Sequence, residues 1–493
     1  MRFRQCVCLV VMLCVVAFAA DGKPGKERPH KTVSKTLPVT TGSRAARKLF
    51  ESGMAKLELW HQNEALADWR AATRKDSKFA LAHLFVAYAT EDPAEESREL
   101  AQAKQFAPRT SQGEQLLIRW LAGVRQGEYV PGIAAMNDLL ALYPDDQRVD
   151  FLTGRWLLLQ ERYEQAQMLL ERALASDPND AAAINILGYT YALSNNFEKA
   201  FAMMERYVAL QPEEPNPHDS YGEILRLAGR YEAAVAQYRM SVKLDPEFGS
   251  TIGIADTYAL MGREQDARDE YERALLFTTS ESQRVGIETQ LAITYFRENK
   301  NSLGNHALRA VAKHAHQAGL ARLEAEAHRI MAMYEPDLGN ALQDLETAEK
   351  PLNEHHQIAP VDRDEEQALI LYTRASRAVS NSRETAEKAL QQLQTMAESG
   401  RSRVIERVWH AAQGALLVAQ GKYAEALPHL EEDKLNPLSM RLLWEAYTKT
   451  GKQAQADQIQ AALTGYNQVT VEQALVVPRF RETVAEKSQP PQP

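Results

Sequence analysis

The sequence has few of the residues that carry chemistry in proteins. Its three cysteines, Cys6, Cys8 and Cys14, all lie in the N-terminal leader. The rest of the chain therefore has no disulfide, no thiol nucleophile and no cysteine-based zinc site. Positive charge is also scarce, since 57 Lys and Arg stand against 66 Asp and Glu and leave a net charge of -9. A nucleic-acid surface needs excess positive charge to displace counterions from phosphate, so this balance argues against a nucleic-acid partner.

The leader itself is arranged like a secretory signal peptide. Arg2 and Arg4 precede a mostly apolar run from Cys6 to Val16, and residues 17–19 read Ala-Phe-Ala, which is a typical cleavage site. A spanning helix needs about twenty consecutive apolar residues, and no run reaches that length. We therefore expect export by a cleavable signal peptide to the periplasm or the exterior, with no integral membrane segment in the mature chain.

Composition and periodicity divide the chain into consecutive segments. These are a signal peptide (1–20), a flexible Lys/Pro/Thr-rich linker (21–43), a helical solenoid (44–350), a loop or break (351–364), further helix pairs (365–465) and a C-terminal extension with a disordered tail (466–493). The linker has almost no large apolar residue with which to offset the entropy of ordering. The break is predicted from Pro351 and Pro360, and a short amphipathic piece is expected at 470–475.

A period of 34 residues organises the middle of the chain. Three kinds of residue recur in one register: prolines (Pro144, Pro178, Pro212, Pro246), aromatic residues (Tyr129, Tyr163, Phe197, Tyr231) and small residues (Gly132, Ala166, Ala200, Ala234). Small residues let two helices approach closely, and proline ends a helix because it cannot continue the hydrogen-bond ladder. Glycines such as Gly127 and Gly229 predict left-handed helix ends. The pattern indicates helix pairs and no sheet.

The order of small, bulky, aromatic, small and proline residues resembles the tetratricopeptide repeat family. One repeat shows it at Gly188, Tyr191, Phe197, Ala200 and Pro212. The resemblance is strongest over 112–277 and recurs near Gly53 and Gly414. It implies an all-α fold, a right-handed α-solenoid of stacked antiparallel helix pairs.

The resemblance also implies a partner-binding groove, because the first helix of each repeat lines a concave face in this family. The corresponding positions are Leu121, Phe151, Arg155, Asn185, Tyr189, Asp219, Glu223 and Asp256. The predicted groove is apolar at its start and acidic toward Glu223 and Asp256. It would suit an extended or helical peptide with one apolar and one basic end. The alternative is that these residues merely solvate the inner face.

Catalytic and metal-binding patterns are missing from the sequence. It has no Gly-x-Ser-x-Gly elbow, phosphate-binding Walker loop, dinucleotide fingerprint or His-Glu-x-x-His string. His314 and His316 are expected on different faces of a helix. We therefore predict no metal, no cofactor and no enzyme. The leading hypothesis is a non-catalytic scaffold or adaptor outside the cytoplasm that binds a protein or peptide. Alternatives are a carbohydrate- or envelope-polymer-binding module and, less favoured, a hydrolase with a site in 282–400.

Overall fold

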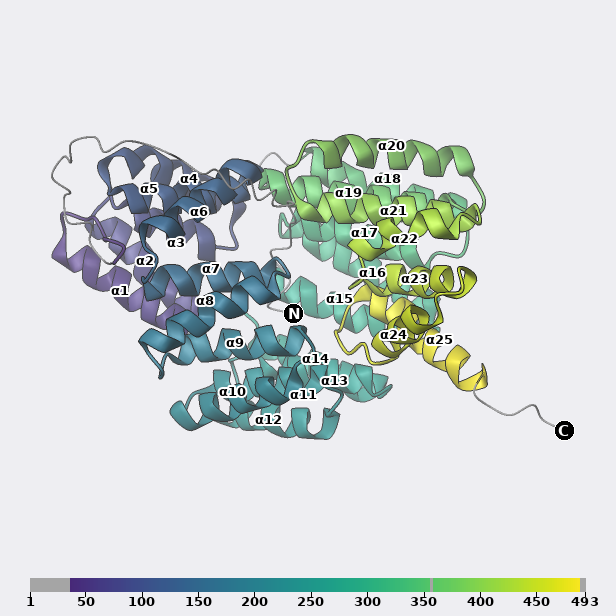
Figure 1. The fold of residues 1–493 in the computed structure, drawn as a ribbon, viewed down its shortest axis with the longest axis horizontal. Coiled ribbons are helices and arrows are strands. Elements are labelled where there is room, and N and C mark those ends of the chain that lie inside the picture. Colours follow the sequence, from purple (N-terminus) through teal and green to yellow (C-terminus); the bar gives the residue numbers. More distant parts are fainter. Residues whose placement is uncertain (1–35, 355–357, 488–493) are drawn as a thin grey trace, which may run out of the picture.

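The molecule is built from helices throughout the part that the computed structural model describes, which is residues 36–354 and 358–487. Within those ranges there are twenty-five α-helices, a short 3₁₀ helix at Ala107–Arg109, and no strand. Consecutive helices pack as antiparallel pairs, and each pair stacks on the next (Figure 1). This confirms the predicted all-α solenoid. The expected signal peptide lies outside the described residues.

Seven helix pairs make up the first half of the chain. They are α1 (Arg44–Glu58) with α2 (Gln62–Lys75), α3 (Ala80–Ala89) with α4 (Pro93–Phe106), α5 (Gln112–Arg125) with α6 (Tyr129–Leu142), α7 (Gln147–Leu159) with α8 (Tyr163–Ser176), α9 (Ala181–Leu193) with α10 (Phe197–Leu210), α11 (Pro215–Leu227) with α12 (Tyr231–Leu244), and α13 (Ser250–Leu260) with α14 (Glu264–Phe277). These helices gather in one lobe of the molecule (Figure 1).

Five more pairs and a final helix form the second lobe. They are α15 (Glu281–Arg297) with α16 (Asn301–Gln317), α17 (Ala321–Tyr334) with α18 (Leu338–Glu354), α19 (Pro360–Ala378) with α20 (Arg383–Glu398), α21 (Arg403–Ala419) with α22 (Tyr423–Glu432), α23 (Pro437–Lys449) with α24 (Gln453–Thr464), and then α25 (Val471–Lys487).

Local sequence signals begin the repeat helices. The Ser111 hydroxyl caps α5, and the Glu114 carboxylate accepts a hydrogen bond from the Ser111 backbone N–H at 2.9 Å, which completes a capping box. Asp180 follows the Pro178 stop and caps α9 by accepting from the Ala183 N–H at 3.0 Å. The proline row therefore ends one repeat directly before the residue that starts the next.

In the 34-residue repeats, the turn inside each pair contains one residue with left-handed backbone. Along four successive repeats these are Gly127 (φ 76°), Glu161 (φ 59°), Asn195 (φ 64°) and Gly229 (φ 76°). They are spaced by 34 residues, as the sequence period requires. The prediction of left-handed ends at Gly127 and Gly229 is confirmed, and the two intervening repeats make the same turn without glycine.

Close helix contact explains the row of small residues at Gly154, Gly188 and Gly222. A Cβ placed on Gly222 would lie 2.9 Å from the ring of Tyr238, whose side chain is buried on the paired helix. A Cβ on Gly154 would lie 2.9 Å from Leu170 in the same way. A larger residue in this row would push the two helices of a pair apart.

The packed body begins earlier than predicted. Residues 36–43 belong to the expected flexible linker, yet Leu37 and Val39 are each 7% exposed. The backbone N–H of Thr40 donates to the Glu114 carboxylate at 2.7 Å, and that of Leu37 donates to Asp146. The linker prediction is therefore wrong for this stretch, because two apolar side chains and two buried acceptors hold it against α5 and α7.

The predicted loop or break at 351–364 is much shorter where the structure describes it, because of its described residues only 358 and 359 lie outside a helix. Pro351 lies inside α18, and Pro360 is the first residue of α19, where a proline costs no backbone hydrogen bond. Helix α19 packs on both α17 and α18, so the stack continues across this region.

The C-terminal extension is more ordered than the short amphipathic piece expected at 470–475. Helix α25 runs to Lys487 with Pro478 inside it, and it packs against α15, α23 and α24. Its Val477 and Phe480 are buried with Met440 and Leu463. Burial of these apolar side chains therefore stabilises α25 although it contains a proline.

Contacts between distant segments bring the two lobes together. Arg125 of α5 donates to Asp362 of α19 at 2.9 Å, and Arg407 of α21 donates to both carboxylate oxygens of Glu161 at 2.7 and 2.9 Å. Asn467 accepts from the Tyr231 hydroxyl at 2.7 Å. Glu161 and Gly229 mark the turns that the second lobe meets. The C-terminal helices thus stack on the turn edge of the N-terminal repeats.

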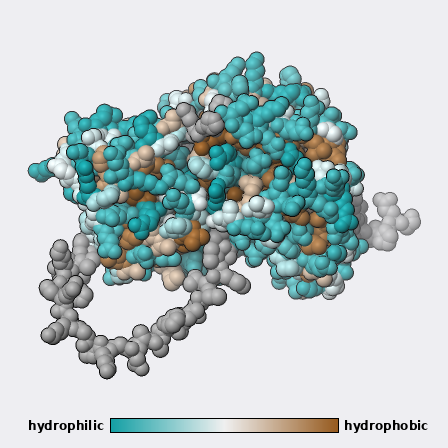
Figure 2. All heavy atoms as spheres, turned by 90° about the horizontal axis from the view of Figure 1, so that it is seen from above, coloured by the Kyte–Doolittle hydropathy of each residue, from teal (hydrophilic) through white to brown (hydrophobic). Residues whose placement is uncertain are grey.

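The outer surface is largely hydrophilic, with scattered apolar patches, on the face shown in Figure 2. Across the described ranges, no helix is both long enough and apolar enough to cross a membrane.

Candidate partner-binding surface

The predicted groove residues lie on the first helices of successive pairs, as the resemblance implied. Leu121 is on α5, Phe151 and Arg155 on α7, Asn185 and Tyr189 on α9, Asp219 and Glu223 on α11, and Asp256 on α13. Six of these eight side chains are buried, with exposed fractions between 2% and 8%, and the exceptions are Asp219 and Glu223. An open groove along the whole row is therefore not present.

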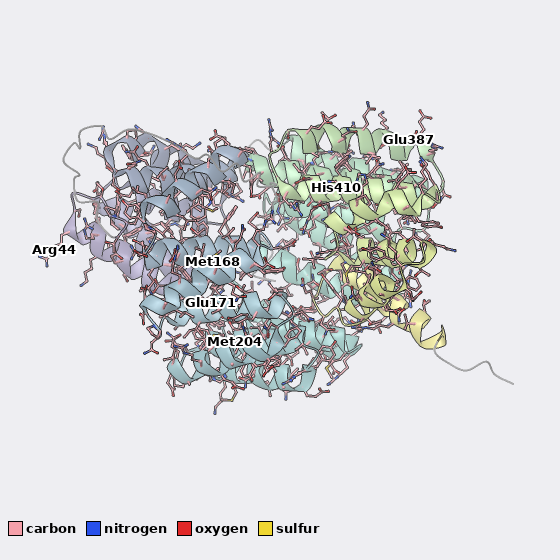
Figure 3. All side chains as sticks on the ribbon, in the orientation of Figure 1. Arg44, Met168, Glu171, Met204, Glu387 and His410 are labelled. Carbon is pink, nitrogen blue, oxygen red and sulfur yellow. The ribbon has the colours of Figure 1, made fainter. Side chains whose placement is uncertain are left out.

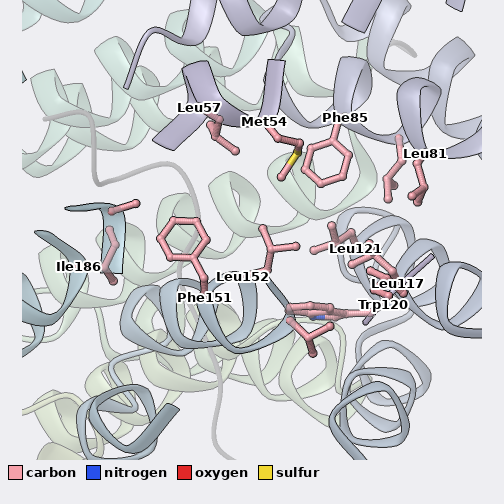
Figure 4. Close-up of a cluster of buried hydrophobic side chains, with 14 of the residues drawn as sticks. Met54, Leu57, Leu81, Phe85, Leu117, Trp120, Leu121, Phe151, Leu152 and Ile186 are labelled. Carbon is pink, nitrogen blue, oxygen red and sulfur yellow. The ribbon is translucent and has the colours of Figure 1, made fainter. Parts of the chain in front are cut away.

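Helices α1 and α3 fill the apolar end of the predicted groove. Leu57 and Phe85 face Leu121 and Phe151 across a shared hydrophobic cluster (Figure 4). Exposing such a surface would cost about 1.5–3 kcal/mol for each large side chain. Leu121 and Phe151 are core residues, and their prediction as exposed partner contacts is wrong. The solenoid curves far enough to bring its first helices onto its own inner face.

Arg155 forms a polar contact with the same N-terminal helices. Its Nη1 donates to the Tyr88 hydroxyl at 2.9 Å, and its guanidinium lies 4.9 Å from the centroid of the Trp60 ring. Such a stacked cation is worth about 0.5–2 kcal/mol when partly desolvated. The predicted role of Arg155 as an exposed groove residue is therefore corrected, because its cationic group already has partners within the chain.

Two further polar contacts join the N-terminal helices to the inner face of later repeats. Arg148 Nη2 lies 2.7 Å from Glu51, and His61 Nε2 lies 3.3 Å from Glu214. The residues in these pairs are separated by 97 and 153 positions in the sequence. A repeat pattern does not encode such contacts, so sequence reasoning missed Trp60, Tyr88 and their partners.

The middle of the row is a hydrogen-bonded ladder. The Tyr189 hydroxyl donates to Glu223 at 2.9 Å, and Arg226 Nη2 donates to the other oxygen of Glu223 at 3.1 Å. Arg226 also donates to the backbone carbonyl of Asn467 at 3.2 Å. Burial raises the pKa of Tyr189 well above its usual value, so its hydroxyl remains a donor. Asn185, 3% exposed, lies one turn before Tyr189.

The acidic end is divided between a buried and a partly exposed part. Asp256 is 2% exposed and accepts from the Tyr271 hydroxyl at 2.6 Å, so it serves the pair α13 and α14. Asp219 accepts from the Ser250 hydroxyl at 2.6 Å and keeps partial exposure. The Glu223 side chain is 20% exposed. Of the predicted groove, Asp219 and Glu223 are the carboxylates that solvent reaches.

A carboxyl group replaces the aromatic residue of the repeat at Glu264, the first residue of α14. Its side chain is largely buried, and its Oε2 has no hydrogen-bond partner within the described residues. Burial raises the pKa of Glu264 to about 7. Sequence reasoning missed Glu264, because this repeat is one residue shorter than the others and its aromatic position therefore falls at 264 instead of 265.

The histidines weighed in the sequence have partners of their own. His314 contacts Glu288 at 2.8 Å and Glu281 at 2.9 Å, and His316 contacts Glu324 at 3.1 Å. Within residues 36–354 and 358–487, no three His, Cys, Asp or Glu side chains gather closely enough to hold a metal ion together.

Comparison with known proteins supports the repeat assignment. The tetratricopeptide repeat family model matches residues 157–224, from the end of α7 into α11. A crystal structure of a MamA protein has 17% identity, covers 35% of this chain and 94% of its own, and has a TM-score of 0.28. A crystal structure of a tetratricopeptide repeat protein from Parabacteroides merdae is 12% identical in sequence. The match covers 55% of this chain and 93% of that protein, with a TM-score of 0.35. These likenesses carry no argument about ligands or partners. No curated protein matches the sequence.

Proposed function

We propose that this tetratricopeptide repeat protein is a non-catalytic scaffold that acts outside the cytoplasm and holds a protein partner at the acidic end of its inner face. The family match over 157–224 supports protein binding in general. The location rests on the leader, where Arg2 and Arg4 precede an apolar run and a small-residue cleavage site.

The proposal rests on the carboxylates of Asp219 and Glu223, whose positions are fixed by hydrogen bonds. Tyr189 orients Glu223 at 2.9 Å and Ser250 orients Asp219 at 2.6 Å, while both acids keep partial exposure. A donor from another chain would meet acceptors whose positions are already set, so little side-chain entropy is lost on binding. The matching chemistry is a Lys or Arg on an extended or helical segment of the partner.

The contact site is tested by placing a photo-reactive amino acid at position 252 in the producing cells, because Ile252 is partly exposed on α13 one repeat after Asp219 and leaves both carboxylates in place. A discrete cross-linked protein is expected at 252, and mass spectrometry identifies it. The matched control is the same amino acid at position 168, because Met168 is 63% exposed on α8 (Figure 3). Equal adducts at both positions would count against a specific inner-face site.

The charges are tested with the purified partner. Asp219→Asn combined with Glu223→Gln is expected to weaken binding about tenfold, since charge-assisted contacts are lost while side-chain shape is kept. Met168→Glu adds charge to the outer face and is expected to leave affinity unchanged. A partner that responds to Met168→Glu and ignores the paired neutralisation would refute the proposed surface.

The location is tested by cell fractionation and intact mass. The exported protein is expected to lack about its first twenty residues, as the cleavage pattern at 17–19 predicts. Recovery of the full-length chain from the cytoplasm would contradict export.

A further inference from the structure

Two histidines meet across the hairpin of α21 and α22. The Nδ1 atoms of His410 and His429 are 2.9 Å apart, and their ring centroids are separated by 5.0 Å with the planes tilted by 44°. The Trp409 ring packs edge-on to both, with centroids 4.4 Å and 5.6 Å away. Both histidines are partly exposed, and His410 is seen on α21 in Figure 3.

The two rings share one hydrogen bond, in which the Nδ1–H of one ring donates to the Nδ1 of the other. The accepting Nδ1 therefore presents an unprotonated lone pair to its neighbour. Neutral imidazole nitrogens are also the preferred ligands of late first-row transition metals.

We propose that His410 and His429 chelate one divalent late transition-metal ion, Cu²⁺ or Ni²⁺, through their Nδ1 atoms, with water in the remaining positions. The 2.9 Å separation is that of the hydrogen bond between the two rings, and it brings both nitrogens within reach of one ion whose metal–nitrogen bonds are about 2.0–2.1 Å long. Affinity for nitrogen ligands rises from Co²⁺ through Ni²⁺ to Cu²⁺ and falls again at Zn²⁺, which favours Cu²⁺ and Ni²⁺.

Ion binding breaks the shared hydrogen bond and needs no net proton release. The shared proton moves from Nδ1 to the Nε2 of the same ring through solvent, and both rings turn so that their Nδ1 lone pairs point toward one ion instead of toward each other. The charges around the site are mixed. Arg403 opposes a cation, but it also pairs with Glu432 at 3.3 Å, and Glu432 favours positive charge at His410. The positive charge of the Arg403 guanidinium is therefore balanced by the Glu432 carboxylate.

The test uses the full chain without a polyhistidine tag, titrated with CuSO₄ or NiCl₂ alone and followed by calorimetry and tryptophan fluorescence. One equivalent of Cu²⁺ is expected to bind and to quench Trp409. His410→Gln and His429→Gln are each expected to weaken binding at least tenfold. Trp409→Phe should keep the stoichiometry and lose most of the quenching.

The matched control replaces His355 and His356, which are neighbours in the sequence, with glutamine. This double variant is expected to bind Cu²⁺ like the parent chain. Unchanged binding in His410→Gln, or lost binding in the control, overturns the site. Electron paramagnetic resonance of the parent chain gives a readout that needs no variant. Hyperfine coupling from two nitrogens is expected, and its absence overturns the chelate. Tighter binding of Zn²⁺ than of Cu²⁺ would overturn the assignment of the ion.

Discussion

Replacing Phe151 with alanine distinguishes a filled inner face from an open one. Phe151 is 7% exposed and packs in the cluster that α1 and α3 share with α5 and α7. Removing a buried phenyl ring costs about 3–5 kcal/mol, because transfer energy is lost and a cavity remains. The same change at a solvent-exposed groove position would cost within about 0.5 kcal/mol. The two interpretations therefore differ by several kcal/mol.

Urea unfolding followed by far-ultraviolet circular dichroism measures this difference. The Phe151→Ala variant is expected to unfold at lower urea than the parent chain with an unchanged slope. Met168→Ala is the matched control, since Met168 is 63% exposed and its loss should shift stability by no more than about 0.5 kcal/mol. A loss below about 1 kcal/mol for Phe151→Ala would refute the filled inner face.

Three further predictions concern packing, protonation and closure. Gly53→Ala should cost about 1–3 kcal/mol in thermal or urea unfolding, because the new Cβ would lie 2.4 Å from the buried Trp69 ring; unchanged stability would contradict the close crossing. The pKa of Glu264 is raised from 4.5 to about 7 on folding, so its contribution to stability falls as pH rises from 4.5 through 7, by about 3 kcal/mol. Glu264→Gln should remove this dependence, and parallel pH–stability curves would contradict the assignment. Arg407→Ala should speed hydrogen exchange in both α21 and the turn at Glu161, since their two hydrogen bonds are lost; exchange changed in α21 alone would show that the lobes do not meet there.

Local features of the fold could be predicted from the sequence because each repeat uses the same short-range physics. Small residues such as Gly222 mark close helix crossings, and Gly127 marks a left-handed turn. Asn195 makes the same turn without glycine, so a glycine rule alone misses it. Pro351 indicated a break, yet burial of neighbouring apolar side chains such as Leu352 keeps it inside α18.

The candidate site was predicted less well, because the shape of a groove depends on how repeats that are distant in the sequence are placed in space. The helix and face of each inner-row residue follow from the 34-residue period. Whether that face is open depends on the small rotations that accumulate between pairs. Those rotations bring Trp60 and Tyr88 onto Arg155, and no spacing in the sequence signals this contact. Asp219 and Glu223 retain partial exposure at the far end of the row.

The closure of the repeat stack is tested most directly by cross-linking positions 61 and 214. His61 and Glu214 are separated by 153 positions, and their side chains meet at 3.3 Å. His61→Cys and Glu214→Cys are introduced after Cys6, Cys8 and Cys14 are replaced by alanine, and a short bis-maleimide is added. Rapid intramolecular cross-linking of the folded protein, lost in urea, is the predicted result. A folded protein that fails to cross-link would contradict the account.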